Sequence, residues 1–409
     1  MLYRLYCDYI TLSQQLYRRE VVIIMYSPIG FLRGVVKDYD WGSSTLIQNF
    51  AGIDYPRIAE VWFGAHPSAP SEVLYPGLEP IKLHDDIAHQ NEDFELDRGD
   101  LPFLVKLLAA DKSLSIQVHP DKCQAEHGFL AENQGGIPVG SSERNYKDAN
   151  HKPEVIVALT EFRALSGLRT PKDCIKTLEL CGSQQFEYYI SLLRDGNIFD
   201  VLADMVRETN SLYNYMMFSK DELSVIDDDN IQVFYECAEQ HPGDGRALVV
   251  LLMNYVVLQP GNSMFTPPGV LHAYLSGLGV EVMSSSDNVV RAGLTSKHVD
   301  VEELLSLVNT DTDYNSPLVS DSVNSLMTSV DSKYDDVDFM VQSIHVDDYT
   351  TVLVEGGYGI VLCTEGVVDT DLGVIHPGEA LWFSNTSDAG EVLHLDNTDE
   401  SDGEVIVVS

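Results

Sequence analysis

The stretch that decides the fold is Leu-Gln-Pro-Gly-Asn-Ser-Met-Phe, residues 258–265, in which a Pro-Gly pair separates two short β-type runs. The same pattern returns at residues 375–382 as Ile-His-Pro-Gly-Glu-Ala-Leu-Trp. A strand, a tight Pro-Gly turn and a second strand are typical of the hairpins of a jelly-roll barrel. The repetition of this unit predicts two related β domains in one chain.

Four further runs of β-branched and apolar residues precede the first copy and are predicted to be strands. They occupy residues 59–65, 103–109, 114–119 and 155–159. The polar residues 121–150 interrupt them and are predicted to form a long loop, or a short helix followed by a loop. Further along the chain, β sequence is expected to resume at residues 247–258.

The pattern changes at Thr170-Pro171, which resembles a helix N-cap followed by proline at the first helical position. Apolar residues then recur at helical rather than alternating spacing. They are Ile175, Leu178, Tyr188, Ile190, Leu193, Val201, Leu202, Met205 and Val206. Residues 171–245 are therefore predicted to form a helical insertion between two β blocks.

These patterns predict a mainly β fold with a helical insertion, in which two jelly-roll β-barrels flank an α-helical module. The expected parts are an N-terminal extension (1–24), a catalytic β domain (25–170 and 246–310), the helical insertion (171–245), an acidic connector with little core (311–338) and a second β domain (339–409). Residues 1–24 do not resemble an export signal, and we assign them no function.

Charge and cysteine content narrow the classes of partner. The 409-residue chain has a formal net charge of -39 at pH 7, which repels phosphate backbones and anionic lipid. We therefore expect neither nucleic-acid nor membrane binding, and an anionic substrate must meet a local basic pocket. The six cysteines are scattered without a CxxC pair, so we expect reduced thiols in a cytoplasmic protein.

A metal centre is predicted from three segments. In residues 114–119 the alternation of a strand places Ser115, Gln117 and His119 on one face. The same alternation pairs Lys152 with Glu154 just before a buried apolar run. The third segment is the turn Pro-Pro-Gly, which precedes His272.

Two imidazoles, a carboxylate and an amide oxygen suit a divalent transition metal, with zinc first. Taken alone, each segment more often has a structural explanation: hydrogen-bonded polar residues for Gln117 and His119, a salt-bridged strand edge for Lys152 and Glu154, and a structural histidine for His272. The second copy of the Pro-Gly unit has Ala389 where the first has His272, which predicts a second β domain without metal.

At these residues the sequence resembles the type I mannose-6-phosphate isomerases, or phosphomannose isomerases, of the cupin superfamily. The resemblance spans roughly residues 30–300 and rests on the segments YDWGS (39–43), AEVWFGAHP (59–67), LPFLVK (101–106), SIQVHP (115–120), NHKPE (150–154), PPGVLHAY (267–274) and EVMSSSDNVVRAGLT (281–295). It implies two cupin-like barrels and interconversion of mannose 6-phosphate and fructose 6-phosphate, a reaction of carbohydrate metabolism that leads toward GDP-mannose biosynthesis.

The resemblance also implies the site residues. One zinc ion per chain would be held by Gln117, His119, Glu154 and His272. Arg291 would belong to the active site, surrounded by Glu281, Asp287, Lys106, His151 and Lys152. The partner would be a small hexose 6-phosphate, and the protein a monomer or weak homo-oligomer.

Moving a carbonyl between C1 and C2 through an enediolate requires a proton shuttle and support for a growing negative charge. Lys152, a His151–Asp287 pair and Glu281 are candidates for the shuttle, and Glu281 is equally compatible with orienting a neighbour. Arg291 is expected to support the enediolate. Ser115 and Lys297 are candidates for the phosphate, although Lys297 is equally typical of an exposed lysine at a helix start.

Two other classes of function remain open. One is a catalytically silent protein that binds zinc or a sugar phosphate. The other is a metal-cupin oxygenase that uses iron, which a single carboxylate and a Gln ligand disfavour.

Overall fold

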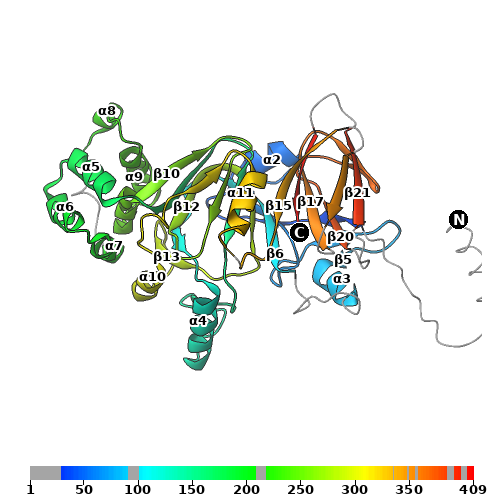
Figure 1. The fold of residues 1–409 in the computed structure, drawn as a ribbon, viewed down its shortest axis with the longest axis horizontal. Helices are drawn as coiled ribbons and strands as arrows, with labels where there is room; N and C mark the ends of the chain where they lie inside the picture. The colour runs from blue at the N-terminus through cyan, green and yellow to red at the C-terminus, as the bar shows by residue number, and fades with distance from the viewer. Residues whose placement is uncertain are drawn as a thin grey trace, which may run out of the picture.

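The computed structural model describes residues 29–90, 101–208, 218–334, 336–347, 350–354, 358–384, 391–397 and 403–409. The expected extension at residues 1–24 and the comparison at Ala389 lie outside these ranges. Figure 1 shows an elongated molecule with helices at one end, a large sheet in the middle and the C-terminal strands at the other end.

The large sheet surrounds the candidate site. Its main path runs β14 (Leu318–Ser320), β11 (Ser263–Thr266), β8 (Glu154–Ala158), β12 (His272–Ser284), β6 (Phe103–Ala110), β3 (Glu60–Phe63), β2 (Val35–Lys37). Off this path, β12 also pairs with β7 (Ile116–Val118) and with β9 (Phe162–Leu168). Strand β7 pairs in turn with β13 (Val290–Gly293), and β9 pairs with β10 (Met253–Leu258). Because β12 is 13 residues long, its two ends take different partners.

A second sheet contains most of the C-terminal strands. Its order is β15 (Val341–Val346), β22 (Gly403–Val408), β17 (Tyr358–Glu365), β20 (Ala380–Ser384), β1 (Ile29–Arg33), β4 (Glu72–Leu74), β5 (Ile81–Lys82). A third sheet has the order β16 (Thr350–Val354), β21 (Glu391–Asn397), β18 (Val368–Thr370), β19 (Gly373–Ile375). The expected boundary at residue 339 does not divide these sheets, because β1 pairs with β20 through Ile29 and Phe383.

The two Pro-Gly units form the same turn. Gly261 and Gly378 have φ angles of 85° and 88°, a left-handed conformation that glycine adopts without strain. Each glycine N–H donates to a carbonyl of the neighbouring strand, Ala158 and Cys363 respectively. The mainly β fold with a helical insertion is thus confirmed, whereas the strands in the described ranges form open sheets rather than the closed jelly-roll barrels that we expected.

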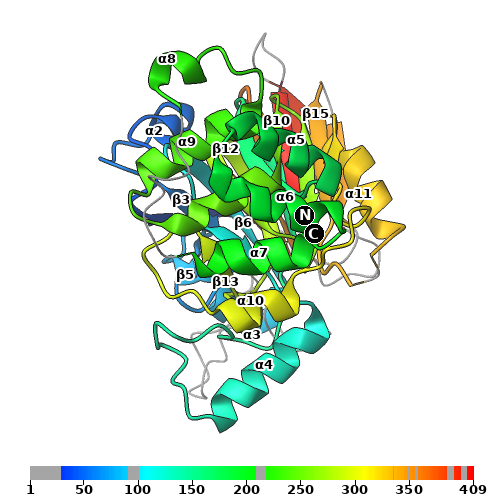
Figure 2. The same ribbon diagram turned by 90° about the vertical axis from the view of Figure 1, so that its left-hand side faces the viewer.

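The helical module covers one end of the large sheet, and Figure 2 shows it facing the viewer. It contains α5 (Pro171–Cys181), α6 (Glu187–Arg194), α7 (Ile198–Arg207), α8 (Lys220–Leu223), α9 (Asp229–Gln240) and the 3₁₀ helices η2 (Gln184–Phe186) and η4 (Gly245–Leu252). The Thr170 side chain accepts a hydrogen bond from the backbone N–H of Asp173, as an N-cap does.

The expected start of β structure at residue 247 was wrong. Residues 247–252 belong to η4, all of them are buried, and the strand β10 begins only at Met253. Helices α7 and α9 both pack on η4, so its apolar run is enclosed as a helical turn and not as a strand.

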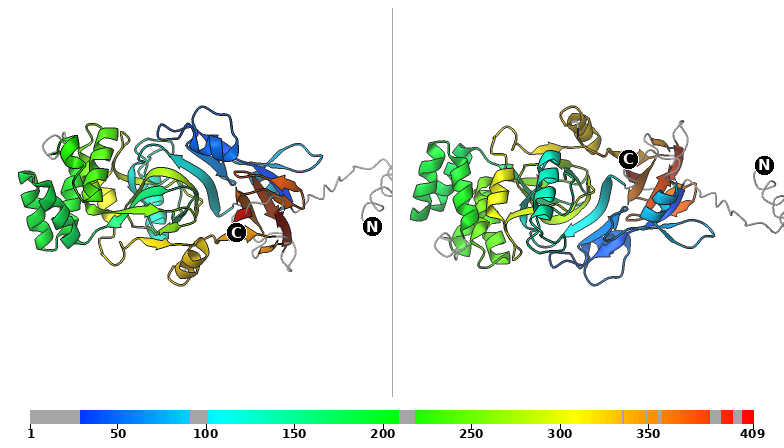
Figure 3. Two further views of the ribbon diagram at one scale, coloured as in Figure 1. Left: turned by 90° about the horizontal axis from the view of Figure 1, so that it is seen from above. Right: turned by 90° about the horizontal axis from the view of Figure 1, so that it is seen from below.

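The expected acidic connector also proved wrong, because residues 311–338 contain a helix that belongs to the core. Helix α11 (Val323–Asp331) buries Val323, Leu326, Met327 and Val330 in the core that joins the two larger sheets. Figure 3 shows α11 lying beside the C-terminal strands. The remaining helices are α2 (Leu46–Ala51), α3 (Leu83–Gln90), α4 (Lys122–Gln134) and α10 (Val301–Leu307).

The core between the sheets brings the N- and C-terminal parts together. Phe265 and Val282 of the large sheet pack in one cluster with Ile360, Trp382 and Val408 of the second sheet. Burial of each such side chain stabilises the fold by about 1.5–3 kcal/mol. In the described part of the chain, no helix is long and apolar enough to span a bilayer, and the cysteines are free thiols.

Candidate metal centre and active site

Two histidines and a glutamate meet at the inner end of β8 and β12. The Nε2 atom of His119 lies 3.3 Å from Glu154 Oε1, and the Nε2 atom of His272 lies 3.1 Å from Glu154 Oε2. The three side chains are buried, and one ligand atom from each lies within 4.8 Å of the others. They come from segments far apart in the sequence that the sheet brings together.

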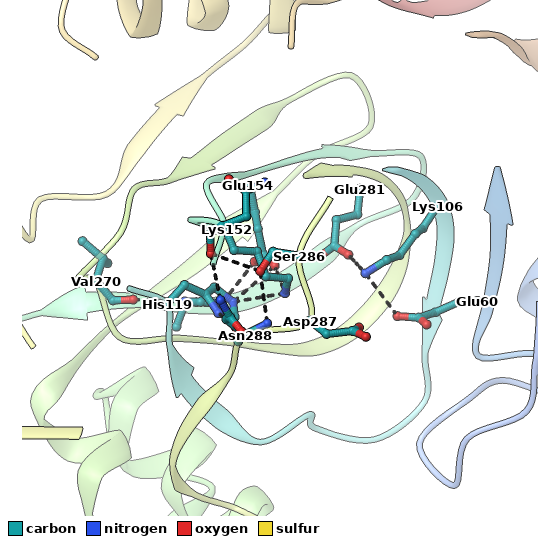
Figure 4. A network of polar contacts seen from close by, with 12 residues as sticks. Glu60, Lys106, His119, Lys152, Glu154, Val270, Glu281, Ser286, Asp287 and Asn288 are labelled. Carbon is teal, nitrogen blue, oxygen red and sulfur yellow. Dashed lines mark hydrogen bonds and ion pairs between the residues drawn. The ribbon is translucent and has the colours of Figure 1, made fainter. Parts of the chain in front are cut away.

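Backbone carbonyls orient both imidazoles. His119 Nδ1 lies 2.7 Å from the carbonyl oxygen of Asn288, and His272 Nδ1 lies 3.0 Å from that of Val270. A carbonyl can only accept, so each Nδ1 carries the proton and each Nε2 presents a lone pair to the centre. Figure 4 shows His119 with Asn288, Lys152 and Glu154 around it.

This donor set fits a divalent metal. Neither Glu154 Oε2 nor His272 Nε2 has a hydrogen-bond partner among the described residues, although both atoms are buried. Two lone pairs therefore face each other across 3.1 Å, an arrangement that a cation between them would satisfy. Imidazole and carboxylate are common zinc ligands.

The charge states also suit metal binding. Burial, followed by the nearby Lys152 ammonium, lowers the pKa of His119 to about 3, which keeps its imidazole neutral. Burial favours the neutral acid of Glu154, but the Lys152 ammonium and the two imidazoles hold the pKa of Glu154 well below its ordinary value. Neutral imidazole and ionised carboxylate are the forms that metals bind.

Gln117, the fourth ligand expected from the sequence, lies beside this centre. It pairs across the sheet with His272 of β12 on one side and with Arg291 of β13 on the other. Its side chain lines the same cleft as Glu154. The register of three short strand segments therefore places an amide, an imidazole and a guanidinium next to one another.

A cleft of about 1060 Å³ opens above the centre. Its lining includes the expected site residues Lys106, Ser115, Gln117, Lys152, Glu154, Glu281, Asp287, Arg291 and Lys297. The segment from Gln240 at the end of α9 to Arg246 in η4 forms part of the wall, so the helical module shapes the cleft. The alternation of β12 places Glu281 in the cleft and Val280 and Val282 in the core, as the sequence predicted.

A buried charge cluster lies next to the metal centre. Lys106 Nζ lies 2.6 Å from Glu281 Oε2 and 3.8 Å from Glu60 Oε1, and Figure 4 shows the three side chains in a row. The Trp62 indole N–H donates to Glu60 at 2.7 Å. Burial disfavours the ammonium, but Glu281 and Glu60 raise the pKa of Lys106, whereas burial raises the pKa of Glu60.

The expected pair of His151 with Asp287 is not formed. The Nε2 atom of His151 lies 2.8 Å from Asp338, while Asp287 faces His66 at 3.5 Å. Lys152 and Glu154 point toward the metal centre, so the alternation of an extended chain turns His151 away from it. The hydrogen bond with His66 lowers the pKa of Asp287 to about 2, which makes it a poor proton acceptor.

Two cations in the cleft, Arg291 and Lys297, have no acidic partner among the described residues. In the described ranges no ion pair joins Arg291 or Lys297 to a carboxylate, although the chain has a formal net charge of -39. Burial lowers the pKa of Arg291, and burial followed by the Arg291 charge lowers the pKa of Lys297. Cations held in this way attract an anionic ligand.

Sequence reasoning gave no role to three residues of this site. Lys147 lines the cleft near Lys297, Tyr274 lies on its floor, and Asn288 orients His119. Asn288 also holds the loop before the metal segment, because its side chain bonds the backbone of Lys147, Asp148 and Asn150. The spacing of two residues from His272 could have indicated Tyr274, whereas the Asn288 contacts depend on tertiary structure.

The fold and the site together define a protein of three β-sheets and a helical module, with a candidate His₂Glu metal centre beside a cleft that contains both cations and carboxylates. Residues 30–171 match the family model "Phosphomannose isomerase type I, catalytic domain". The mannose-6-phosphate isomerase of Salmonella typhimurium is 34% identical over 387 residues, which cover 88% of this chain and 98% of that protein. The chain belongs to the type I phosphomannose isomerase family.

Solved structures agree with this assignment. A variant of Salmonella typhimurium phosphomannose isomerase superposes with a TM-score of 0.80 at 30% identity, over 93% of this chain and 99% of that one. A zinc-bound mannose 6-phosphate isomerase superposes with a TM-score of 0.78, also at 30% identity and with the same coverage of both chains. The resemblance predicted from the motifs is confirmed.

Proposed function

We propose that this protein interconverts mannose 6-phosphate and fructose 6-phosphate, with one zinc ion held by Gln117, His119, Glu154 and His272. The observation that carries the proposal is the pair of facing lone pairs on Glu154 and His272, at the floor of a cleft that also contains unpaired cations. The family membership and the zinc-bound neighbour support the choice of metal and substrate.

A metal in this centre would act as a Lewis acid that polarises the carbonyl of an open-chain sugar. The protein's own cations would fix the other end of the substrate. Lys297 and Arg291 would bind the phosphate electrostatically, and the Ser115 hydroxyl on the same cleft wall would donate to a phosphate oxygen. Arg291 would also lie close enough to the reacting carbons to support negative charge, because it is paired in register with Gln117.

Isomerisation moves one proton from C2 of the aldose to C1 and one hydroxyl proton from O2 to O1. Lys152 and Glu281 are the candidates for the carbon-bound proton, since both line the cleft and each is paired with an oppositely charged side chain. His151 is displaced from this role by its contact with Asp338. Asp287, with its low pKa, would instead accept a hydrogen bond from a sugar hydroxyl.

The test measures consumption of fructose 6-phosphate and mannose 6-phosphate by the purified full chain in zinc-replete buffer, with the metal content determined in parallel. The proposal expects turnover and about one zinc per chain. His272→Ala should lose metal and activity together, whereas Arg291→Ala should keep its metal and lose most turnover. A zinc-loaded chain without turnover would indicate the silent binding protein, and an iron-loaded chain without isomerase activity would indicate the oxygenase.

A further inference from the structure

Tyr274 has a buried hydroxyl without a hydrogen-bond partner in the described part of the chain. The side chain is 3% exposed, and its hydroxyl makes no hydrogen bond to any of the described residues. Tyr274 nevertheless lines the cleft. A buried hydroxyl without a partner destabilises a protein, so its presence at the floor of a binding cleft points to a ligand.

The packing of the ring does not need the hydroxyl. The Tyr274 ring meets Phe162 edge to face at 5.2 Å and belongs to an apolar cluster that includes Leu108, Ile156 and Met264. A phenylalanine would make the same ring contacts. The structure therefore gives the hydroxyl no part in holding the sheet together.

The position of the ring shows which part of a substrate the hydroxyl would meet. Tyr274 follows His272 by two residues on the same strand face, and the two rings are 6.4 Å apart. Burial raises the pKa of Tyr274 and the Glu281 carboxylate raises it further, so Glu281 lies close to the hydroxyl on the other side of the ring. The hydroxyl thus lies between the metal centre and the Lys106–Glu281 pair, at the reacting end of the cleft.

We propose that Tyr274 is a further catalytic residue, whose hydroxyl donates a hydrogen bond to the sugar oxygen at C1 or C2. This inference rests on the proposed isomerase function. A phenol is protonated at neutral pH and is a good donor. Because negative charge grows on that oxygen as the enediolate forms, a donor fixed there stabilises the transition state more than the bound substrate.

The test compares Tyr274→Phe with a matched control, Tyr334→Phe. The hydroxyl of Tyr334 is likewise buried without a partner among the described residues, and its ring packs on Phe265 at 5.2 Å, but Tyr334 does not line the cleft. Each variant is measured for kcat, KM, zinc content and the midpoint of urea unfolding. Both changes remove one unpaired hydroxyl, so neither midpoint should fall.

The expected result is a loss of kcat on the order of 100-fold in Tyr274→Phe, the size typical of removing one oxyanion donor. Tyr334→Phe should keep the wild-type kcat, and both variants should keep their zinc. The inference is overturned if Tyr274→Phe retains kcat within twofold, or loses it only together with zinc. An inactive wild-type protein would overturn the proposed function itself, whereas an active wild type beside an equally active Tyr274→Phe overturns this inference alone.

Discussion

Replacing Lys106 with methionine tests the buried charge cluster that adjoins the metal centre. The Lys106 ammonium is the cation that faces both Glu281, at 2.6 Å, and Glu60, at 3.8 Å, and all three side chains are buried. Methionine keeps most of the length and apolar character of the lysine stem. Lys106→Met therefore removes a charge while leaving the packing nearly unchanged.

The expected loss is large because two carboxylates remain buried without a counter-charge. Removal of one partner from a buried ion pair typically lowers the free energy of unfolding by about 3–5 kcal/mol. Glu60 keeps the hydrogen bond from the Trp62 indole, so most of the loss should come from Glu281. We expect about 3–5 kcal/mol at pH 7, measured by urea unfolding with zinc at the same saturating level in each sample.

The loss should shrink in mild acid. Burial already raises the pKa of Glu60, and loss of the Lys106 ammonium, which lowers it, raises it further above the unfolded value of about 4.3, so the folded variant binds a proton more tightly than the unfolded chain. The variant then gains stability as pH falls from about 7 to 5. In the wild type the pKa of Lys106 is raised, so its contribution is fully present below the unfolded pKa of about 10.4 and is constant over this window.

Lys82→Met is the matched control. Lys82 pairs with Glu72 at 3.0 Å on the surface, where its side chain is 45% exposed, and such a pair typically contributes less than about 1 kcal/mol. The reasoning fails if Lys106→Met costs no more than Lys82→Met. It also fails if the loss is the same at pH 5 and pH 7, because a packing defect would not depend on pH.

Three further predictions concern the site and the core. Asn288→Ala should weaken zinc binding by about 10- to 100-fold in competition with a chelator, because the carbonyl that orients His119 loses its support; unchanged affinity would show that this support is unnecessary. Lys297→Met should raise KM for the sugar phosphate by at least about tenfold with little change in kcat, since one charge-assisted contact contributes about 1.5–3 kcal/mol; an unchanged KM would remove Lys297 from the phosphate site. Met327→Ala in α11 should lower the free energy of unfolding by about 2–5 kcal/mol in urea titrations, and a loss below about 0.5 kcal/mol, usual for surface positions, would contradict the core role of this helix.

The metal segment could be predicted from the sequence because its geometry is local. Strand alternation alone places Gln117 beside His119 and Glu154 beside Lys152. In the structure Gln117, Lys152 and Glu154 line the cleft, and His119 lies 3.3 Å from Glu154. The same rule applied to His151 would have turned it away from Lys152. The sequence alone could not show that His151 would pair with Asp338, because Asp338 lies 187 residues further along the chain.

Two secondary-structure predictions were wrong because amino-acid composition or an apolar run was a poor guide. In residues 311–338 the many aspartates suggested a solvated connector, yet Val323, Leu326, Met327 and Val330 follow helical spacing and are buried. For residues 247–252 the pattern itself gave no answer. An unbroken apolar segment has no period, so it fits a buried strand as well as a buried helix. The pairing of β1 with β20 joins the two ends of the chain, which no local pattern reports.

Strand β12 contributes side chains to both the metal centre and the Lys106–Glu281 pair. In an unbroken strand Tyr274 and Glu281, seven residues apart, would face opposite sides of the sheet, yet both line the cleft. A bulge resolves this, because Leu275 is an extra residue between Tyr274 and Ser276 in the pairing with β9. Before the bulge, the face of β12 that points away from the cleft packs on the helical module. After the bulge, the face that points away from the cleft packs between the sheets.

Gly277 lies just after the bulge that changes which side chains of β12 face the cleft. Its φ of 123° lies in a region that residues with a Cβ rarely adopt, and a Cβ there would come within 2.6 Å of the Glu161 carbonyl oxygen. The bulge and the glycine together let His272 and Tyr274 serve the metal end of the cleft while Glu281, from the same strand, meets Lys106. The second Pro-Gly unit repeats the turn of the first unit. The arrangement of the candidate site, however, depends on the bulge in β12.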